Sequence, residues 1–199
     1  MDDLLATPIA TAGAYVQVGQ HYAFVLGINH ADHNTLALVR LGGHCEPGEM
    51  GWQCAAREVR EEASLTIHPW EPPITYWLNG DQDSLALHPI HWTESASQQP
   101  APLLVVSYPT TRPGMLSVMY RANASEQPVP SAEVQGLLLL TATDIQSVVQ
   151  QPITLAHYLA HGGQAILRTP LPTNHILVPF LQLRAFAAIL QAQPDFSIK

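Results

Sequence analysis

Five glutamates gather in one short segment of a chain that has few charged residues. The segment, residues 43–65, reads GHCEPGEMGWQCAAREVREEASL, whereas only 12% of the 199 residues are charged. Glu58, Glu61 and Glu62 stand at positions i, i+3 and i+4, so a helix would place them on one side. These carboxylates repel one another, and no lysine stands among them. The pattern fits either a solvated acidic face or a site for a hard cation such as Mg²⁺ or Mn²⁺, which takes oxygen ligands.

A turn followed by a helix is expected to position these carboxylates. Pro47 and Gly48 suit the two central positions of a type II turn, the second of which needs a positive φ. Residues 51–63 then contain many strong helix formers and no proline. Small and apolar side chains recur along this segment at spacings of three and four, which predicts its core-facing side: Trp52, Ala55, Ala56, Val59 and Ala63.

The spacing of the segment resembles the signature box of the Nudix hydrolase family, G-x5-E-x7-R-E-U-x-E-E-x-G-U, in which U is a bulky aliphatic residue. Gly43 opens the box, Glu49 follows after five intervening residues, and Arg57 follows after seven more. The other fixed positions hold the required types: Glu58, Val59, Glu61, Glu62 and Leu65. The single departure is Ser64, where the family has Gly. A left-handed conformation there is expected to cost serine roughly 1 kcal/mol and to leave the preceding carboxylates in place.

The resemblance implies roles for the charged residues of the box. Glu58 and Glu62 correspond to the main ligands of a divalent metal ion, Mg²⁺ or Mn²⁺. Glu61 corresponds to a further ligand and is also expected among the catalytic residues. Arg57 corresponds to the catalytic-site residue that orients the glutamates by ion pairing, with Glu49 as its expected partner.

The resemblance also implies an activity. Family members cleave a nucleoside diphosphate linked to another group, such as ADP-ribose, a nucleotide sugar or a (d)NTP, usually at the pyrophosphate. Metal ions neutralise the diphosphate and lower the pKa of a bound water, and a carboxylate serves as general base. Outside the box, Glu133 and Glu126 are candidates for the base. Glu133 is preferred, because the strand that follows it should return near the helix.

Other residue types with chemical potential stay outside the expected site. Arg40 and Arg121 could contact substrate phosphates or simply lie on the surface. His157 and His161 have zinc spacing on a helix, but they lack the glutamate of the metalloprotease motif and are expected on the surface. The sequence does not choose among four aromatic side chains that could stack on a base: Tyr15, Tyr22, Tyr76 and Trp77.

The order of the elements predicts an α+β fold. Strand-like runs precede and follow the acidic helix, at residues 14–19, 21–29, 35–41, 74–79, 101–109, 115–122 and 133–141. Residues 143–199 are expected to be helical, with helices over 143–150, 153–168 and 175–193, the first capped by Thr143 or Asp144. With a loose lead-in over residues 1–12, the sequence predicts a single Nudix domain over 1–199. Its expected architecture is an α/β/α sandwich around a mixed sheet with a helical C-terminal extension.

Composition excludes several classes of partner. The chain has 16 acidic and 8 basic residues and a net charge of −8, which argues against binding to a nucleic-acid backbone. Metal ions could still bridge such a protein to a phosphate ligand. The N-terminus lacks the pattern of a secretory signal, no run approaches the roughly 18 apolar residues of a membrane span, and two cysteines fit a reducing compartment. We therefore expect a cytoplasmic protein that binds a small nucleoside diphosphate derivative and neither nucleic acid nor membrane.

Other functions and assemblies remain open at this stage. A non-catalytic Nudix-fold module that senses a nucleotide or a sugar-nucleotide is the main alternative, although such modules typically lose box carboxylates and this chain retains them. An isomerase of the related isoprenoid type is a third option that no residue singles out. Many relatives are homodimers, so the C-terminal helices could mediate dimerisation or simply cap the sheet.

Overall fold

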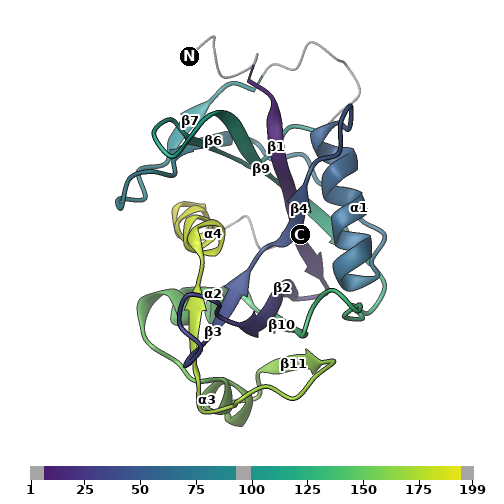
Figure 1. Ribbon diagram of the computed structural model, residues 1–199, viewed down its shortest axis with the longest axis vertical. Helices are drawn as coiled ribbons and strands as arrows, with labels where there is room; N and C mark the ends of the chain where they lie inside the picture. The colour runs from purple at the N-terminus through teal and green to yellow at the C-terminus, as the bar shows by residue number, and fades with distance from the viewer. Residues whose placement is uncertain (1–6, 93–99, 194–199) are drawn as a thin grey trace.

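A mixed β-sheet forms the middle of the protein in the computed structural model, which describes residues 7–92 and 100–193 (Figure 1). Among these residues the sheet contains twelve strands. They are β1 (Ile9–Val18), β2 (His21–Ile28), β3 (Thr35–Val39), β4 (Leu41–His44), β5 (His68–Pro69), β6 (Thr75–Asn79), β7 (His88–Ile90), β8 (Leu104–Tyr108), β9 (Arg112–Ala124), β10 (Gly136–Leu140), β11 (Gln164–Leu167) and β12 (Ile176–Pro179). The helices are α1 (Gly51–Ala63), α2 (Ala142–Gln150), α3 (Leu155–Ala160) and α4 (Leu181–Ala192).

The sheet combines parallel and antiparallel pairs. Its main strand order is β11-β10-β2-β1-β9-β8-β6-β7. Off this path, β3 pairs with β2, β12 with β3, β4 with β1 and β5 with β9. The pairs β1–β9, β6–β8 and β3–β12 are parallel, and the other pairs are antiparallel. The predicted mixed sheet is therefore confirmed.

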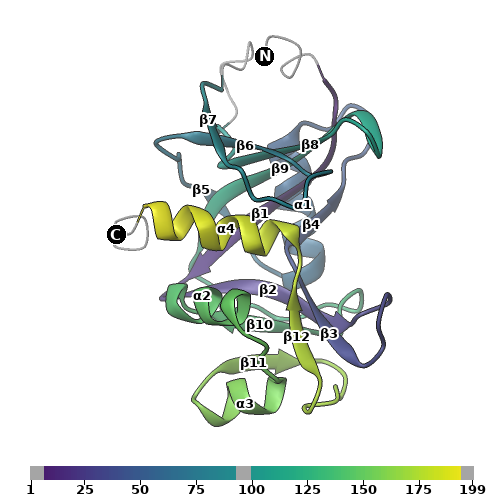
Figure 2. The same ribbon diagram turned by 90° about the vertical axis from the view of Figure 1, so that its left-hand side faces the viewer.

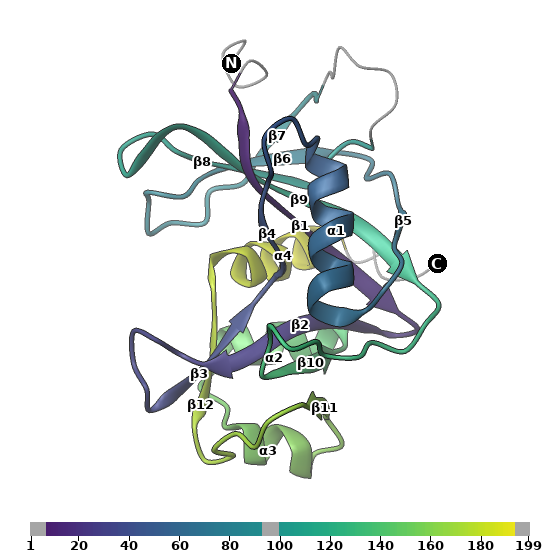
Figure 3. The same cartoon turned by 45° about the vertical axis from the view of Figure 1, so that its right-hand side comes forward.

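Helices cover the sheet on two sides and enclose two apolar cores. Helix α1 lies on one side, whereas α2 and α4 lie on the other (Figures 2 and 3). Under α4, the ring of Phe186 stacks on Tyr15 with 4.0 Å between ring centroids and meets Tyr22 edge-on at 5.0 Å. Each of these buried rings contributes roughly 1.5–3 kcal/mol through apolar burial. The molecule therefore has the α/β/α sandwich that the sequence predicts, with helices on both faces of the sheet.

The predicted loose lead-in is wrong over its last residues. Strand β1 begins at Ile9, because the segment pairs in parallel with β9, starting from Ile9 beside Leu116, and with β4 on its other edge. Backbone pairing on both edges satisfies the polar groups of a segment whose small residues show no strong strand pattern. Residues 1–6 of this prediction lie outside the described part of the chain.

The prediction of a purely helical C-terminal part is also wrong. The helix expected over 153–168 ends at Ala160, because Gly162 adopts a φ of +86° and the chain then forms β11 against β10. The helix expected over 175–193 begins only at Leu181, after strand β12, which closes with Pro179. Residues 194–199 are not among the described residues.

Helix α2 agrees with the prediction except at its cap. Thr141 caps it, since its Oγ1 accepts a hydrogen bond of 3.1 Å from the Asp144 N–H. The Asp144 carboxylate in turn accepts one of 2.9 Å from the Thr141 N–H. The cap therefore precedes both residues that the sequence offered, Thr143 and Asp144, and Asp144 completes a capping box from inside the helix. Across the described residues, no helix is long and apolar enough to cross a membrane.

Candidate functional site

The turn and helix of the acidic segment form as the sequence predicts. The Glu49 N–H donates to the Glu46 carbonyl at 3.0 Å, and Gly48 has a φ of +81°, as a type II turn requires. Helix α1 then runs over Gly51–Ala63, and the Gln53 side chain accepts a hydrogen bond of 3.0 Å from the Met50 N–H at its start. The carboxylates thus project from a helix that is anchored at its N-terminus.

One face of α1 packs against the sheet and leaves the acidic face toward solvent. Of the predicted core-facing residues, Ala55, Val59 and Ala63 are fully buried. Trp52 and Ala56 are partly buried and pack against the same core. The prediction missed Cys54, which is also completely buried. The helix is therefore oriented by a continuous apolar face, and its acidic side is free for polar contacts.

Arg57 ties the loop of the box to the acidic face of the helix. Its Nε and Nη2 donate to the two carboxylate oxygens of Glu49, at 3.0 and 2.9 Å. Its Nη1 donates to Glu58 at 2.8 Å and to Glu61 at 2.9 Å. Its Nη2 also donates to the His44 carbonyl at 2.9 Å. The expected ion pair with Glu49 is present, and it holds the pKa of Glu49 below its usual value.

Glu62 lies in a more buried setting than the other carboxylates. Burial raises its pKa to about 7, against the opposing effects of the Gly42 N–H and the charge of Arg40. The Gly42 N–H donates to Glu62 Oε2 at 2.7 Å. The charges of Glu58 and Glu133 raise the pKa further. A carboxyl group in this position favours an added positive charge, which fits a cation-binding role.

Glycines in β4 make the close approach to the helix sterically feasible. A Cβ at Gly43 would lie 2.3 Å from Glu58 Oε2 and 2.6 Å from its Oε1. Gly42 adopts a φ of +140°, and a Cβ there would lie 2.1 Å from Arg40 Nη1. Gly43, which opens the box, therefore lets the loop pass close to the helix.

Glu133 is positioned beside the C-terminal end of α1, in keeping with the reason for preferring it. The loop before β10 bonds to the helix end, with the Ser131 N–H donating to the Glu62 carbonyl at 3.1 Å and the Val129 N–H to the Ala63 carbonyl at 2.8 Å. Glu133 is exposed, and its charge acts on Glu62. Glu126 is exposed on the same loop, and its charge is not among the main influences on the pKa of Glu62.

A pocket of about 600 Å³ opens next to Glu133. Strands β2 and β3 supply an apolar wall, and Gln135, His30 and the partly exposed ring of Phe180 add polar and aromatic groups. The Gln135 amide oxygen accepts a hydrogen bond of 2.6 Å from the Ile28 N–H, which fixes the rim. The sequence reasoning missed Gln135 and Phe180, because chain segments far apart in sequence bring them together.

The two arginines left open by the sequence are both buried, so their interpretation as surface residues is wrong. Arg40 is 8% exposed, its Nη1 donates to the Ala12 carbonyl at 3.1 Å, and burial lowers its pKa. Its charge lowers the pKa of Glu62. Arg121 is 4% exposed and lies over the ring of Trp70, with 3.3 Å from its Cζ to the ring centroid.

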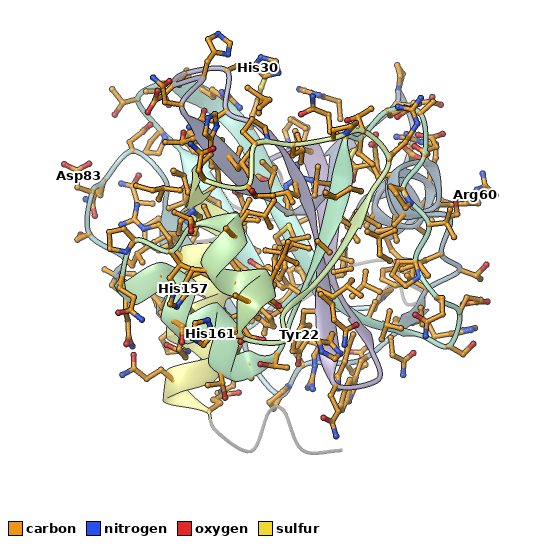
Figure 4. All side chains as sticks on the ribbon, turned by 90° about the horizontal axis from the view of Figure 1, so that it is seen from below. Tyr22, His30, Arg60, Asp83, His157 and His161 are labelled. Carbon is orange, nitrogen blue, oxygen red and sulfur yellow. The ribbon has the colours of Figure 1, made fainter. Side chains whose placement is uncertain are left out.

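The aromatic and histidine candidates lie apart from the pocket or on the surface. Tyr15 and Tyr22 are buried under α4 and cannot stack on a base there, and neither Tyr76 nor Trp77 lines the pocket. His157 on α3 and His161 at its C-cap are exposed, as expected, with 4.1 Å between ring centroids (Figure 4).

The carboxylates of α1 provide donors suited to a hard cation, but they do not converge on one point. Glu58 and Glu61 turn to Arg57, whereas Glu62 turns to the Gly42 N–H. Like charges separate in this way when other partners are available. Oxygen donors at i, i+3 and i+4, together with the raised pKa of Glu62, fit Mg²⁺ or Mn²⁺.

The family model of the NUDIX domain matches residues 8–103 of this chain. Among solved structures, a NUDIX hydrolase from Nitrosomonas europaea is 14% identical, with 69% of this chain and 60% of that one covered and a TM-score of 0.43. A NUDIX-family hydrolase from Clostridium perfringens is 16% identical, with coverages of 70% and 85% and a TM-score of 0.43. An Ap4A hydrolase from C. elegans, in a binary complex, is 18% identical, with coverages of 93% and 99% and a TM-score of 0.45.

A comparison with curated proteins finds no match. The domain match spans both the strands that precede the acidic helix and the helix itself, and it therefore includes the whole box from Gly43 to Leu65. Residues 8–103 are therefore recognised as a NUDIX domain, and the geometry of the box agrees with that match.

Proposed function

We propose that this protein is a divalent-metal-dependent Nudix hydrolase that cleaves the pyrophosphate linkage of a nucleoside diphosphate derivative. The observation that carries the proposal is the contact set of Arg57, which bonds at once to Glu49, Glu58 and Glu61. A solvated acidic face would not require the partly buried guanidinium of Arg57 to pair with three carboxylates at once. Mg²⁺ or Mn²⁺ is the proposed cofactor.

Glu58 and Glu62 are the proposed main metal ligands, and Glu61 is a further one. When bound, the metal would neutralise the diphosphate and lower the pKa of the attacking water. Glu62 approaches from the end of the helix that lies beside the pocket, and the Gly42 N–H orients one of its oxygens. Arg57 keeps the other two carboxylates on one side of the helix through its hydrogen bonds.

Glu133 is the proposed general base. Its position beside Glu62 and at the rim of the pocket supports this role, because a base must stand near both the metal ligands and the substrate. Glu61 is the second catalytic carboxylate, since it is the most exposed of the acids that bond to Arg57, with 39% of its side chain accessible. Either group would take the proton of the water that attacks phosphorus.

The pocket is the proposed binding site for the nucleoside part of the substrate. Its apolar wall and the ring of Phe180 suit a flat base, and Gln135 and His30 offer polar contacts at the rim. Its volume of about 600 Å³ falls within the range of ligand pockets, roughly 300–1,000 Å³. The nucleoside part would then lie beside Glu133 with its diphosphate directed toward α1.

A substrate panel tests the proposal. Purified protein with Mg²⁺ is offered ADP-ribose, NADH, dinucleoside polyphosphates, nucleotide sugars and (d)NTPs, and products are separated by chromatography. We expect Mg²⁺-dependent release of a nucleoside monophosphate or of pyrophosphate from at least one compound. Tight binding of a compound without any turnover would contradict the hydrolase and support the nucleotide-sensing module instead.

A further inference from the structure

The two cysteines of the chain meet inside the box, beside the residues already described. Cys45 follows the end of β4 and is partly exposed, whereas Cys54 lies on α1 and is completely buried. A Cys45 sulfur, a Cys54 sulfur and a Glu49 carboxylate oxygen all lie within 4.8 Å of one another. Within the described ranges, no other set of three His, Cys, Asp or Glu side chains brings its donor atoms this close.

We propose that Cys45, Cys54 and Glu49 bind a thiophilic divalent cation such as Zn²⁺ or Cd²⁺. This site goes beyond the proposed hydrolase function and lies next to the carboxylate face of α1, with Glu49 as the residue that the two share. Two thiolates and one carboxylate are a donor set that Zn²⁺ uses, and a water would complete four-coordination. The hard cation proposed for the glutamates prefers oxygen donors alone, so the two sites differ in the metal they select.

The separation of the donors fits such an ion after a small movement. A tetrahedral ion with Zn–S bonds of about 2.3 Å holds its two sulfurs about 3.8 Å apart. The donors lie within 4.8 Å of one another, so shifts of about 1 Å or less bring them to that geometry. Cys45 can provide the shift, because it stands at the end of a strand and is partly exposed.

The surroundings act in opposite directions on the two thiols, because the hydrogen bond with Cys45 and burial raise the pKa of Cys54. Arg57 Nη2 lies 3.9 Å from the Cys54 sulfur, and a hydrogen bond with Cys54 lowers the pKa of Cys45. On binding, each thiol releases its proton to solvent and its sulfur donates a lone pair to the ion, so no oxidant or reductant is needed. The Glu49 carboxylate has no role in a disulfide, and its presence favours a cation over an oxidised pair.

Occupation of this site would take Glu49 away from Arg57. The Glu49 oxygens accept two hydrogen bonds from Arg57, and an ion bound to one oxygen competes with that arrangement. Arg57 would then lose its link to the loop. A thiophilic ion at this place is thus expected to inhibit turnover, a consequence that rests on the proposed hydrolase function.

Direct metal binding tests the site without reference to turnover. The reduced protein is titrated with Cd²⁺ in excess Mg²⁺, and the Cd–thiolate charge-transfer absorbance reports the ion at sulfur. We expect one equivalent of Cd²⁺ in the wild type. Cys45→Ser should weaken binding by more than about 100-fold, because even the loss of an outer partner of a metal ligand costs 10–100-fold.

A matched control separates the sulfur site from general binding to acidic groups. Glu46→Gln removes an exposed carboxylate from the same loop and should bind Cd²⁺ as the wild type does, whereas Glu49→Gln should bind it more weakly. Absence of the charge-transfer absorbance, or equal Cd²⁺ affinity in Cys45→Ser, would overturn the proposal. Cys45→Ser should fold, because Cys45 is partly exposed, and a thermal melt verifies this.

Inhibition of turnover by the thiophilic ion is tested by a separate rate measurement. Once a substrate is known, Cd²⁺ should lower the Mg²⁺-dependent rate of the wild type and leave that of Cys45→Ser nearly unchanged. Failure to find a substrate would count against the hydrolase and leave the binding result standing. Wild-type turnover that persists with Cd²⁺ bound at sulfur would contradict the inhibition.

Discussion

Arg57 shows how single residues create the candidate site. Its guanidinium has a fixed fork of donors, and these reach Glu49, Glu58, Glu61 and a backbone carbonyl simultaneously. A lysine has one compact charge and cannot match two carboxylate oxygens side by side. The resemblance predicted the pair with Glu49, whereas the bonds to Glu58 and Glu61 became apparent only from the structure, because they depend on side-chain rotamers.

Arg57→Lys should lower kcat/KM by about tenfold to a hundredfold, since catalytic groups that shift by about 1 Å lose up to this factor. The fold should persist, because Arg57 lies on the polar side of α1. Steady-state kinetics with the substrate from the panel and a thermal melt provide the two measurements.

Arg60→Lys is the matched control. Arg60 stands on the same helix, is exposed, and points away from the body of the molecule (Figure 4). It should keep wild-type kinetics. An equal loss in both variants would show that helix charge, and not the contacts of Arg57, sets the rate.

Glu62 should make the stability of the metal-free protein depend on pH. Its pKa is raised to about 7 in the folded state from a usual value of 4.5, so the folded state holds a proton that the unfolded state has lost. Stability from this group is therefore present below the unfolded pKa and is lost as the pH rises through 7. The loss is on the order of 3 kcal/mol, because the pKa rises from 4.5 to about 7 on folding.

Urea unfolding in EDTA at pH 5, 6, 7 and 8 measures this effect. The free energy of unfolding should fall across this range in the wild type, and the fall should be smaller in Glu62→Gln, which has no titrating group. Added Mg²⁺ should restore stability at pH 8, where the carboxylate is ionised. Identical pH profiles in the two proteins would contradict the assignment of Glu62.

At the scale of elements, α1 is the part that the sequence predicted best. Its bounds, its preceding turn and most of its buried face follow from local signals: helix formers, a Pro-Gly turn and spacing of three and four. Strand β4 was not predicted, because its glycines have no strand propensity and serve instead to let Arg40 and Glu58 approach.

The errors in the C-terminal part have a physical origin. The run Ile176–Pro179 is short and apolar, and periodicity alone cannot separate a buried strand from a helix segment of that length. The segment forms a strand because it pairs with β3, which is far away in sequence. Pro179 and the pair Gly162 and Gly163 were the local signals against continuous helices.

Ser64→Gly should stabilise the end of α1. Ser64 is the C-cap, with φ 57° and ψ 30°, a left-handed conformation that disfavours side chains. Glycine there should raise the free energy of unfolding by about 1 kcal/mol, as urea titration can measure. Ser64→Ala keeps a Cβ and should give no such gain. A gain in both, or in neither, would show that the left-handed backbone is not the cause.

At the scale of the whole molecule, the candidate site depends on contacts between distant segments. The loop before β10 brings Glu133 to the end of α1, and the segment between β12 and α4 brings Phe180 to the same pocket. No local pattern reports such contacts. The sequence could therefore place the box and suggest Glu133 from strand order, but it could not reveal the pocket.

Glu133→Gln should lower kcat by about 10² to 10⁴, the usual contribution of a general base, and should alter the acidic limb of the pH–rate profile. Glu126→Gln, on the same loop and equally exposed, should keep both kcat and the profile. A pH–rate series on the two variants makes the comparison. Unchanged kinetics in Glu133→Gln would move the role of base to Glu61.

The carboxylates of α1 are the groups proposed to hold the metal ion that drives hydrolysis. The most direct measurement is the Mg²⁺-dependent kcat/KM of Glu62→Gln beside that of Glu46→Gln, an exposed carboxylate of the same box, with thermal melts of both. We predict that Glu62→Gln loses about 10²- to 10³-fold while it remains folded, because several kcal/mol of charge stabilisation depend on the metal. We predict that Glu46→Gln keeps wild-type activity. Turnover by Glu62→Gln equal to that of the wild type would show that Glu62 is not a metal ligand needed for hydrolysis.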